Sequence, residues 1–260
     1  MDAGLLDHPW ECGLLLALML ACVLELGRMI SGHWRILAET NRKEQLGTIR
    51  DGMFVLLSLL LGFSLALAGA RFAERRTLLV EEAVSIGTAF LRAGTLPEPA
   101  QYQSRSLFRE YVQARLDLDR SWLSTRRFRD EVERAKRIQK ALWSDAQAVA
   151  LHNRDAVTAL YIETLNEMID LHEKRVAAIE NRVPESIWLL IVVVAAVAVF
   201  TRGLTITARF WLTLVLIPAT VAIVVALIAD LDAPSAGLIR LDERALQRVG
   251  DDLKFENSSK

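Results

Sequence analysis

Four long apolar blocks alternate with densely charged segments along the 260-residue chain. A charge at the centre of a bilayer costs about 2.5–3.5 kcal/mol, so a membrane imposes this kind of segregation. The pattern predicts an all-α membrane protein with four transmembrane helices and a helical bundle or coiled-coil-like domain inserted between spans two and three. The expected spans are residues 10–30, 52–70, 184–201 and 211–229. The other expected segments are a short polar loop at 31–51, a helical extramembrane domain at 71–183, a short basic loop at 202–210 and a polar C-terminal tail at 230–260.

Two of the spans carry no charged residue. Gly52–Ala70 would rise about 28 Å as a helix, close to the hydrocarbon thickness of about 30 Å. Trp211–Ala229 contains Pro218, which a membrane helix tolerates when neighbouring helices satisfy the freed carbonyl group. The first span is bracketed by Glu11 and Glu25. We expect it to be a permanent anchor, because no basic segment precedes it and no small-x-small cleavage site follows it.

Small side chains recur on one face of the second span, at every fourth residue. Ser58, Gly62, Ala66 and Ala70 would line a seam along which another helix can approach closely in lipid. We favour intramolecular packing of the four spans along this seam. The alternative is a subunit interface or a strip that faces a pore. No span carries an acidic or basic residue at mid-membrane, so the sequence does not support a proton relay or a voltage sensor.

The inserted domain has the periodicity of amphipathic helices. The second span continues without a breaker to Arg92, after which Gly94, Pro97 and Pro99 end the helix. From residue 126 to residue 183 there is no Gly or Pro, and apolar positions step by three and four, as in heptads. The phase slips near Ala159, which predicts a break or bend there.

The polar residues of this domain carry no recognisable catalytic pattern. His152 and His172 lie on apolar stripes and are expected to be buried and hydrogen-bonded; a ligand-binding or pH-sensing role is the alternative. Glu163 and Glu167 are four residues apart, but solvated helix faces explain them better than a carboxylate site does. Phosphate-binding glycine loops and hydrolase or zinc motifs are absent from the sequence. We therefore expect no enzymatic activity, cofactor or metal, and the net charge of −1 gives no reason to expect nucleic acid.

Charged residues cluster where the second and fourth spans leave the bilayer. Arg71, Arg75 and Arg76 follow the second span, and Asp230 and Asp232 follow the fourth. Both spans should exit on the same side, so the arginines could face the aspartates. Headgroup anchoring and helix capping are one explanation. The other is a ring of charge at the mouth of a pore in an oligomer, where such rings select ions.

Three stretches carry a family resemblance. The runs ARFAERRTLLVEEAVSIGTAFLRAGTLPEP, YIETLNEMIDLHEKRVAAIENRVPESIW and DLDAPSAGLIRLDERAL resemble, in this order, the bacterial bestrophin-like domain family. The resemblance covers most of the chain from Gly52 to Leu246. It implies a membrane protein distantly similar to the bestrophins, pentameric anion channels with four spans and a helical domain after the second. The chain departs from the bestrophin pore signature, because Phe54 and Phe63 are not spaced as a regular aromatic neck.

Charge bias around the spans bears on topology. Acidic residues precede the first span and basic residues follow it, and the loop between the third and fourth spans holds Arg202 and Arg209. The positive-inside rule then places these loops in the cytoplasm and the domain outside. Eight cations flank the membrane on the domain side and seven on the other side, so the raw count does not decide the topology. The resemblance implies a cytoplasmic domain. We follow the first span and predict a multi-pass protein of the bacterial plasma (inner) membrane, with its large domain on the outer side.

These observations favour a homo-oligomeric, ion-conducting membrane protein whose second span lines or abuts the pore. Its expected partners are the lipid bilayer, further copies of itself and ions, with anions suggested by the resemblance. The alternative is a membrane-anchored interaction or signalling scaffold that uses its helical domain to bind a partner.

Overall fold

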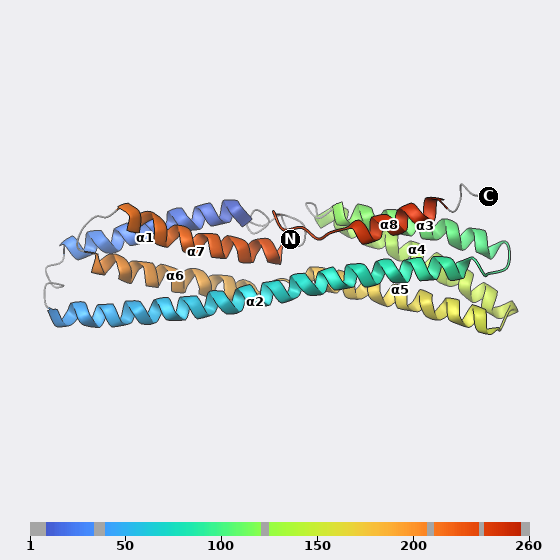
Figure 1. Cartoon of the computed structure of the whole chain (residues 1–260), viewed down its shortest axis with the longest axis horizontal. Helices are drawn as coiled ribbons and strands as arrows, with labels where there is room; N and C mark the ends of the chain where they lie inside the picture. The colour runs from blue at the N-terminus through green and yellow to red at the C-terminus, as the bar shows by residue number, and fades with distance from the viewer. Residues whose placement is uncertain (1–8, 34–39, 121–124, 207–210, 234–236, 256–260) are drawn as a thin grey trace. The chain divides into compact units, whose positions relative to one another are not determined.

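The computed structural model describes residues 9–33, 40–120, 125–206, 211–233 and 237–255, and this part of the chain is helical and contains no strand. The predicted fold class is confirmed. The helices are α1 (Pro9–His33), α2 (Thr40–Ala93), α3 (Ala100–Arg120), α4 (Thr125–His152), α5 (Ala156–Glu180), α6 (Glu185–Thr205), α7 (Trp211–Asp232) and α8 (Arg244–Phe255) (Figure 1).

The chain forms two compact units. The span unit comprises Leu5–Arg71 and Arg182–Ile239, and the bundle unit comprises Phe72–Asn181 and Arg240–Lys260. The boundary between the units falls within the continuous helix α2. Four segments in the described residues are long and apolar enough to cross a membrane: Pro9–Ser31, Glu44–Ala93, Ala156–Thr205 and Trp211–Asp232.

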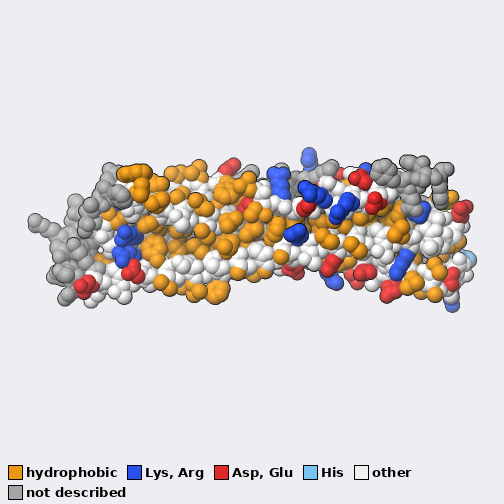
Figure 2. Space-filling view, in the orientation of Figure 1, with side chains coloured by type: hydrophobic (Ala, Val, Ile, Leu, Met, Phe, Trp, Pro, Cys, Tyr) orange, Lys and Arg blue, Asp and Glu red, His pale blue; other side chains and the backbone are white. Residues whose placement is uncertain are grey.

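In the span unit, α1 packs closely against α6 and α7. Gly27 of α1 and Gly203 of α6 lack side chains, which lets these two helices approach closely. A Cβ atom on Gly27 would lie only 3.2 Å from the Cα atom of Gly203. A Cβ atom on Gly13 would lie 2.8 Å from the Cβ atom of Ala226 on α7. Small residues that bring helix backbones together are typical of membrane helix packing. The face of this unit visible in Figure 2 is largely hydrophobic.

In the bundle unit, the end of α2 packs with α3, α4, α5 and α8 around one core. Its fully buried side chains include Ile86 of α2, Tyr111 of α3, Leu142 of α4 and Leu165 of α5. Leu246 of α8 is also fully buried in this core. Phe90 and Phe108 meet edge to face, with ring centroids 6.2 Å apart. On the visible face of the bundle unit, groups of acidic and basic side chains are interspersed among hydrophobic and other residues (Figure 2).

Two segments that we expected to be a polar loop (31–51) and a polar tail (230–260) are partly helical. Helix α2 begins at Thr40 instead of at the start of its apolar block, because residues 40–51 contain no proline and continue the helix in polar form. The expected tail contains α8, whose Leu246 and Leu253 are buried. Residues 207–210 of the expected basic loop lie outside the described residues.

The break expected near Ala159 lies a few residues earlier. Helix α4 ends at His152, and α5 begins at Ala156 with Asp155 as its N-cap. The Asp155 carboxylate accepts a hydrogen bond of 2.7 Å from the backbone N–H of Thr158. This bond lowers the pKa of the Asp155 carboxyl group.

Candidate functional site: the open face of α2 and the buried charge cluster

The seam of small residues on α2 is open to the outside of the chain. Ser58, Gly62, Ala66 and Ala70 are all exposed, and a Cβ atom on Gly62 would meet nothing within 4 Å. The favoured interpretation, intramolecular packing of the four spans, therefore does not apply to this seam. The close packing inside the span unit instead uses Gly27, Gly203 and Gly13, which the sequence analysis did not single out.

The opposite face of α2 contacts the rest of the span unit. Leu57, Leu61, Ser64 and Ala68 are buried there, at steps of four, three and four residues. Phe63 lies with the exposed residues, and 68% of its surface is accessible. Helix α2 therefore has one packed face and one open face, and the small residues and Phe63 lie on the open one.

The open faces of the other spans have a different composition. Their exposed residues are mostly bulky and aliphatic, as suits contact with lipid chains. They include Leu14, Leu15, Leu18 and Leu26 of α1, Leu189, Leu190, Val193 and Val197 of α6, and Val215, Leu216 and Ile223 of α7. The open face of α2 also exposes Val55, Leu56, Leu59 and Leu67, but beside them a hydroxyl group, a bare glycine and two methyl groups recur at every fourth position, a row that the described residues of the other spans do not have.

Asp232, at the end of α7, is buried and engaged within its own chain. Its two carboxylate oxygens accept the backbone N–H of Val183 at 3.0 and 3.2 Å. Arg71 of α2 lies 3.9 Å from the same carboxylate. The expected arrangement of arginine opposite aspartate thus occurs in this pair.

Asp230 is also fully buried. Its carboxylate accepts the backbone N–H groups of Leu238 and Ile239 at 2.9 and 3.0 Å. Gly237 leads into this contact with φ of +148°, in the region that favours glycine. The carboxylate of Asp230 therefore fixes the chain that leaves α7.

Arg75 caps the end of α5 in the bundle unit. Its Nε atom donates to the carbonyl oxygen of Ala178 at 3.0 Å, and its Nη2 atom donates to that of Asn181 at 3.1 Å. A cation is favourable at the carbonyl end of a helix. Of the five residues expected at a charged mouth, Arg71, Arg75, Arg76, Asp230 and Asp232, only Arg76 is exposed.

A charge cluster lies in the core of the bundle unit. Glu82 of α2 is fully buried between Arg115 of α3 and Arg175 of α5. Arg115 approaches the Glu82 carboxylate with Nε at 2.6 Å and Nη2 at 3.0 Å, and Arg175 Nη1 lies at 2.6 Å. Two guanidinium groups from different helices thus face one buried carboxylate.

Tyr111 and Gln139 extend the cluster to α4. The Tyr111 hydroxyl donates to Glu82 Oε1 at 3.3 Å and accepts from Gln139 Nε2 at 3.1 Å. Burial raises the pKa of Tyr111, and the neighbouring carboxylate raises it further. The hydroxyl group therefore remains protonated, and the cluster ties four helices together.

The expectation that both histidines are buried and hydrogen-bonded is met only in part. His172 is fully buried beside this cluster, with Nδ1 3.9 Å from Glu82 Oε1, and neither ring nitrogen makes a hydrogen bond within the described residues. The ring lies beside that of Tyr111, with centroids 6.3 Å apart. His152 is exposed at the end of α4, where its Nδ1 lies 3.0 Å from the carbonyl oxygen of Ala148.

The cluster was missed although the sequence contained a signal for it. Arg115 occupies the stripe between Tyr111 and Leu118, where an apolar residue is expected. A charge at such a position indicates a buried partner. The sequence does not identify that partner, because Glu82 and its neighbour Glu81 are chemically equivalent. The structure shows that Glu82 is buried and Glu81 exposed.

Comparisons with known proteins agree with this architecture. A crystal structure of a bacterial bestrophin homologue from Klebsiella pneumoniae has a TM-score of 0.67 and 16% identity, over 94% of this chain and 98% of that chain. A single-substitution variant of a bacterial bestrophin homologue from that organism matches over the same shares of the two chains, with a TM-score of 0.61 and 15% identity. No curated protein sequence matches the chain. The profile of the bestrophin-like domain family matches residues 13–246. This match covers most of the sequence, and the chain therefore belongs to the bestrophin-like domain family.

Proposed function

We propose that the protein is a homo-oligomeric ion channel in which the open face of α2 lies at or beside the pore. The observation that carries this proposal is the contrast between the spans. All four spans expose bulky aliphatic residues, but only α2, among the described residues, also exposes a row of small residues at every fourth position: Ser58, Gly62, Ala66 and Ala70. A seam of small residues is poorly suited to lipid and well suited to close contact with another helix or to a water-filled path.

The family relationship supports conduction as the function of such an oligomer. The resemblance implies anions as the ions, and we propose chloride as the first to test. We further propose that the membrane-crossing portions are residues 10–30, 52–70, 184–201 and 211–229, in the bacterial plasma membrane. Arg76, which is exposed just beyond the second span, is the residue that we propose for a charged mouth.

The first test is ion flux through the purified, full-length protein in liposomes. Chloride and potassium are measured separately, with empty liposomes as the control. Selective flux above the control is the expected result. Flux equal to that of empty liposomes, from protein shown to be folded and oligomeric, would contradict the proposal for an ungated channel and favour a scaffold.

A matched pair of substitutions tests the role of the open face. Ser58 and Thr220 are both exposed, and each donates its hydroxyl group to the carbonyl oxygen four residues earlier at 2.8 Å. We expect Ser58→Leu to reduce flux at least about tenfold by filling the seam. Thr220→Leu makes a similar change on α7 and should leave flux unchanged. Loss of oligomers with Ser58→Leu would indicate that the seam serves assembly alone.

A further inference from the structure

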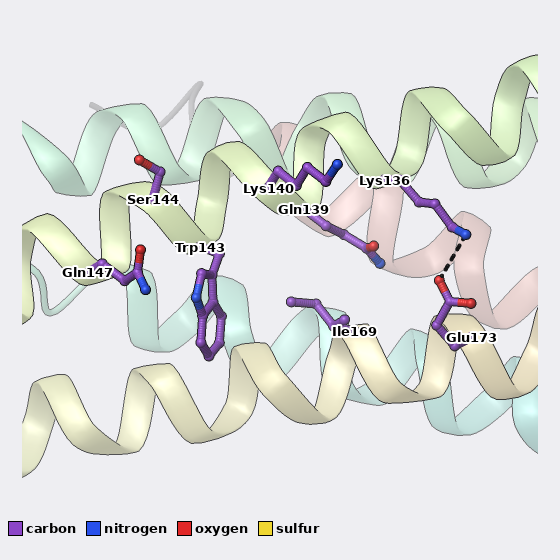
Figure 3. A pocket seen from close by; sticks show the side chains of 8 residues that line it. All are labelled: Lys136, Gln139, Lys140, Trp143, Ser144, Gln147, Ile169 and Glu173. Atoms are coloured by element: carbon purple, nitrogen blue, oxygen red, sulfur yellow. Dashed lines mark ion pairs between the residues drawn. The ribbon is translucent and has the colours of Figure 1, made fainter.

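An open groove runs between α4 and α5 of the bundle unit. It consists of two adjoining pockets of about 330 and 410 Å³, and both are lined by Trp143 and Gln147. Figure 3 shows the first pocket, with the indole ring of Trp143 reaching from α4 towards α5 and Ile169 rising from α5. These volumes lie at the lower end of the range for small-molecule sites.

One end of the groove is polar and positively charged. Lys136 pairs with Glu173 of α5 at 3.3 Å, which closes this end (Figure 3). Lys140 lies one turn along α4, is exposed and has no acidic partner within the described residues. The three charges of the lining, two ammonium groups and one carboxylate, leave one positive charge. This balance suits an occupant with one negative charge.

The other end of the groove is apolar. Besides Trp143 and Gln147, it is lined by Ala146, Ala150 and Leu151 of α4 and by Ile162 of α5. Trp143 lies between the two ends and offers its ring to both pockets. Along α4, Lys140 and Ala150 are separated by about 15 Å at the helical rise of 1.5 Å per residue. A molecule with an anionic head and an apolar body that lies along α4 from the Lys140 end would contact both pockets.

The polar wall is preformed. Gln139 is buried, and its side-chain amide donates to the Tyr111 hydroxyl at 3.1 Å, which fixes its position at the edge of the groove. A wall that is already ordered reduces the conformational cost of binding. A neutral apolar ligand would leave Lys140 unpaired, and a small inorganic anion would leave the apolar end unfilled.

We propose that this groove binds an amphipathic monocarboxylate, with its carboxylate at Lys140 and its apolar body against Trp143 and Ala150. The charge of the lining, the aromatic ring at its centre and the apolar pocket beyond together define this chemical class. The proposal does not depend on whether the protein conducts ions, because binding is measured without flux.

The test uses the full-length protein in lipid nanodiscs, with protein-free nanodiscs as the blank. Two probes are titrated by calorimetry: 4-phenylbutyrate and its neutral analogue 4-phenylbutyramide, which differ in charge but hardly in shape. We expect the acid to bind at least about tenfold more tightly than the amide, because a charge-assisted contact is lost in the amide.

Two variants locate the site. Lys140→Gln should weaken binding of the acid about tenfold and leave that of the amide unchanged. Lys174→Gln, at an exposed lysine of α5 outside the groove, should change neither. Lys140 is exposed, so its loss should not alter the thermal unfolding of the protein. Equal binding of acid and amide, no binding of either at millimolar concentration, or equal weakening by both variants would each overturn the proposal.

Discussion

Gly27 of α1 and Gly203 of α6 face each other at backbone contact. A Cβ atom on Gly27 would lie 2.5 Å from the carbonyl oxygen of Phe200, and one on Gly203 would lie 3.1 Å from the Cα atom of Gly27. Neither atom in the way belongs to a flexible side chain. Any side chain at these two positions would therefore push the helices apart.

Substitution of Gly203 by alanine should destabilise the span unit by about 1–3 kcal/mol, the usual cost of overpacking. Gly69→Ala is the control, because a Cβ atom there would meet nothing within 4 Å. The control should be neutral or slightly stabilising, since alanine favours helix. Thermal unfolding of the detergent-solubilised protein measures both. Equal midpoints for the two variants would show that the close contact does not limit stability.

The cluster around Glu82 predicts an unequal response to charge removal. Glu82→Gln would remove the buried carboxylate that pairs with both Arg115 and Arg175, which should cost about 3–5 kcal/mol. Arg115→Met would leave a balanced pair of Glu82 and Arg175 and should cost less. Glu81→Gln, at the exposed neighbouring position, should have little effect. Chemical unfolding of the three variants gives the order, and a larger loss for Arg115→Met than for Glu82→Gln would contradict the central role of the Glu82 carboxylate in this cluster.

The aspartate after the fourth span and the exposed arginine after the second should affect different properties. Asp232→Ala would leave the N–H of Val183 without its acceptor, with an expected loss of about 1–3 kcal/mol in stability. Arg76→Gln should leave unfolding unchanged and alter the ratio of chloride to potassium flux. If Asp232→Ala unfolds normally and changes only selectivity, the carboxylate serves the pore instead.

Membrane topology can be measured with a reporter fused after Leu91. The charge bias around the first span predicts that alkaline phosphatase is active in this fusion, because the enzyme folds only outside the cytoplasm. A cytoplasmic fluorescent reporter at the same position should then be dark. The opposite pair of results would place the bundle unit in the cytoplasm, as the family resemblance implies.

Hydropathy along the chain was sufficient for the fold class. A bilayer acts on each segment separately, so an uncharged block such as Trp211–Ala229 can be recognised without knowledge of its neighbours. The break between α4 and α5 also left a local trace, in the phase of the apolar stripe near Ala159.

Contacts between helices could not be predicted in the same way. Glu82 meets Arg115 at a separation of 33 residues and Arg175 at 93 residues, and no local pattern encodes these distances. The seam from Ser58 to Ala70 indicates that a helix can come close, but it does not indicate which helix. Gly27 is well separated from Gly13 in the first span, and Gly203 lies in the expected basic loop, so none of these glycines forms a close repeat that would attract attention.

The packing of α8 affects the order in which the protein can mature. Leu246 and Leu253 are buried in the core of the bundle unit, yet they are synthesised after the fourth span. When residues 72–181 leave the ribosome, their core still lacks this last helix. The bundle unit therefore reaches its final packing only after all four spans have been made, and a nascent chain stalled before Arg244 would leave Val112 and Leu116 of α3 without the helix that packs beside them. Completion of the bundle therefore waits for the twelve residues of α8, which are made only after the last span.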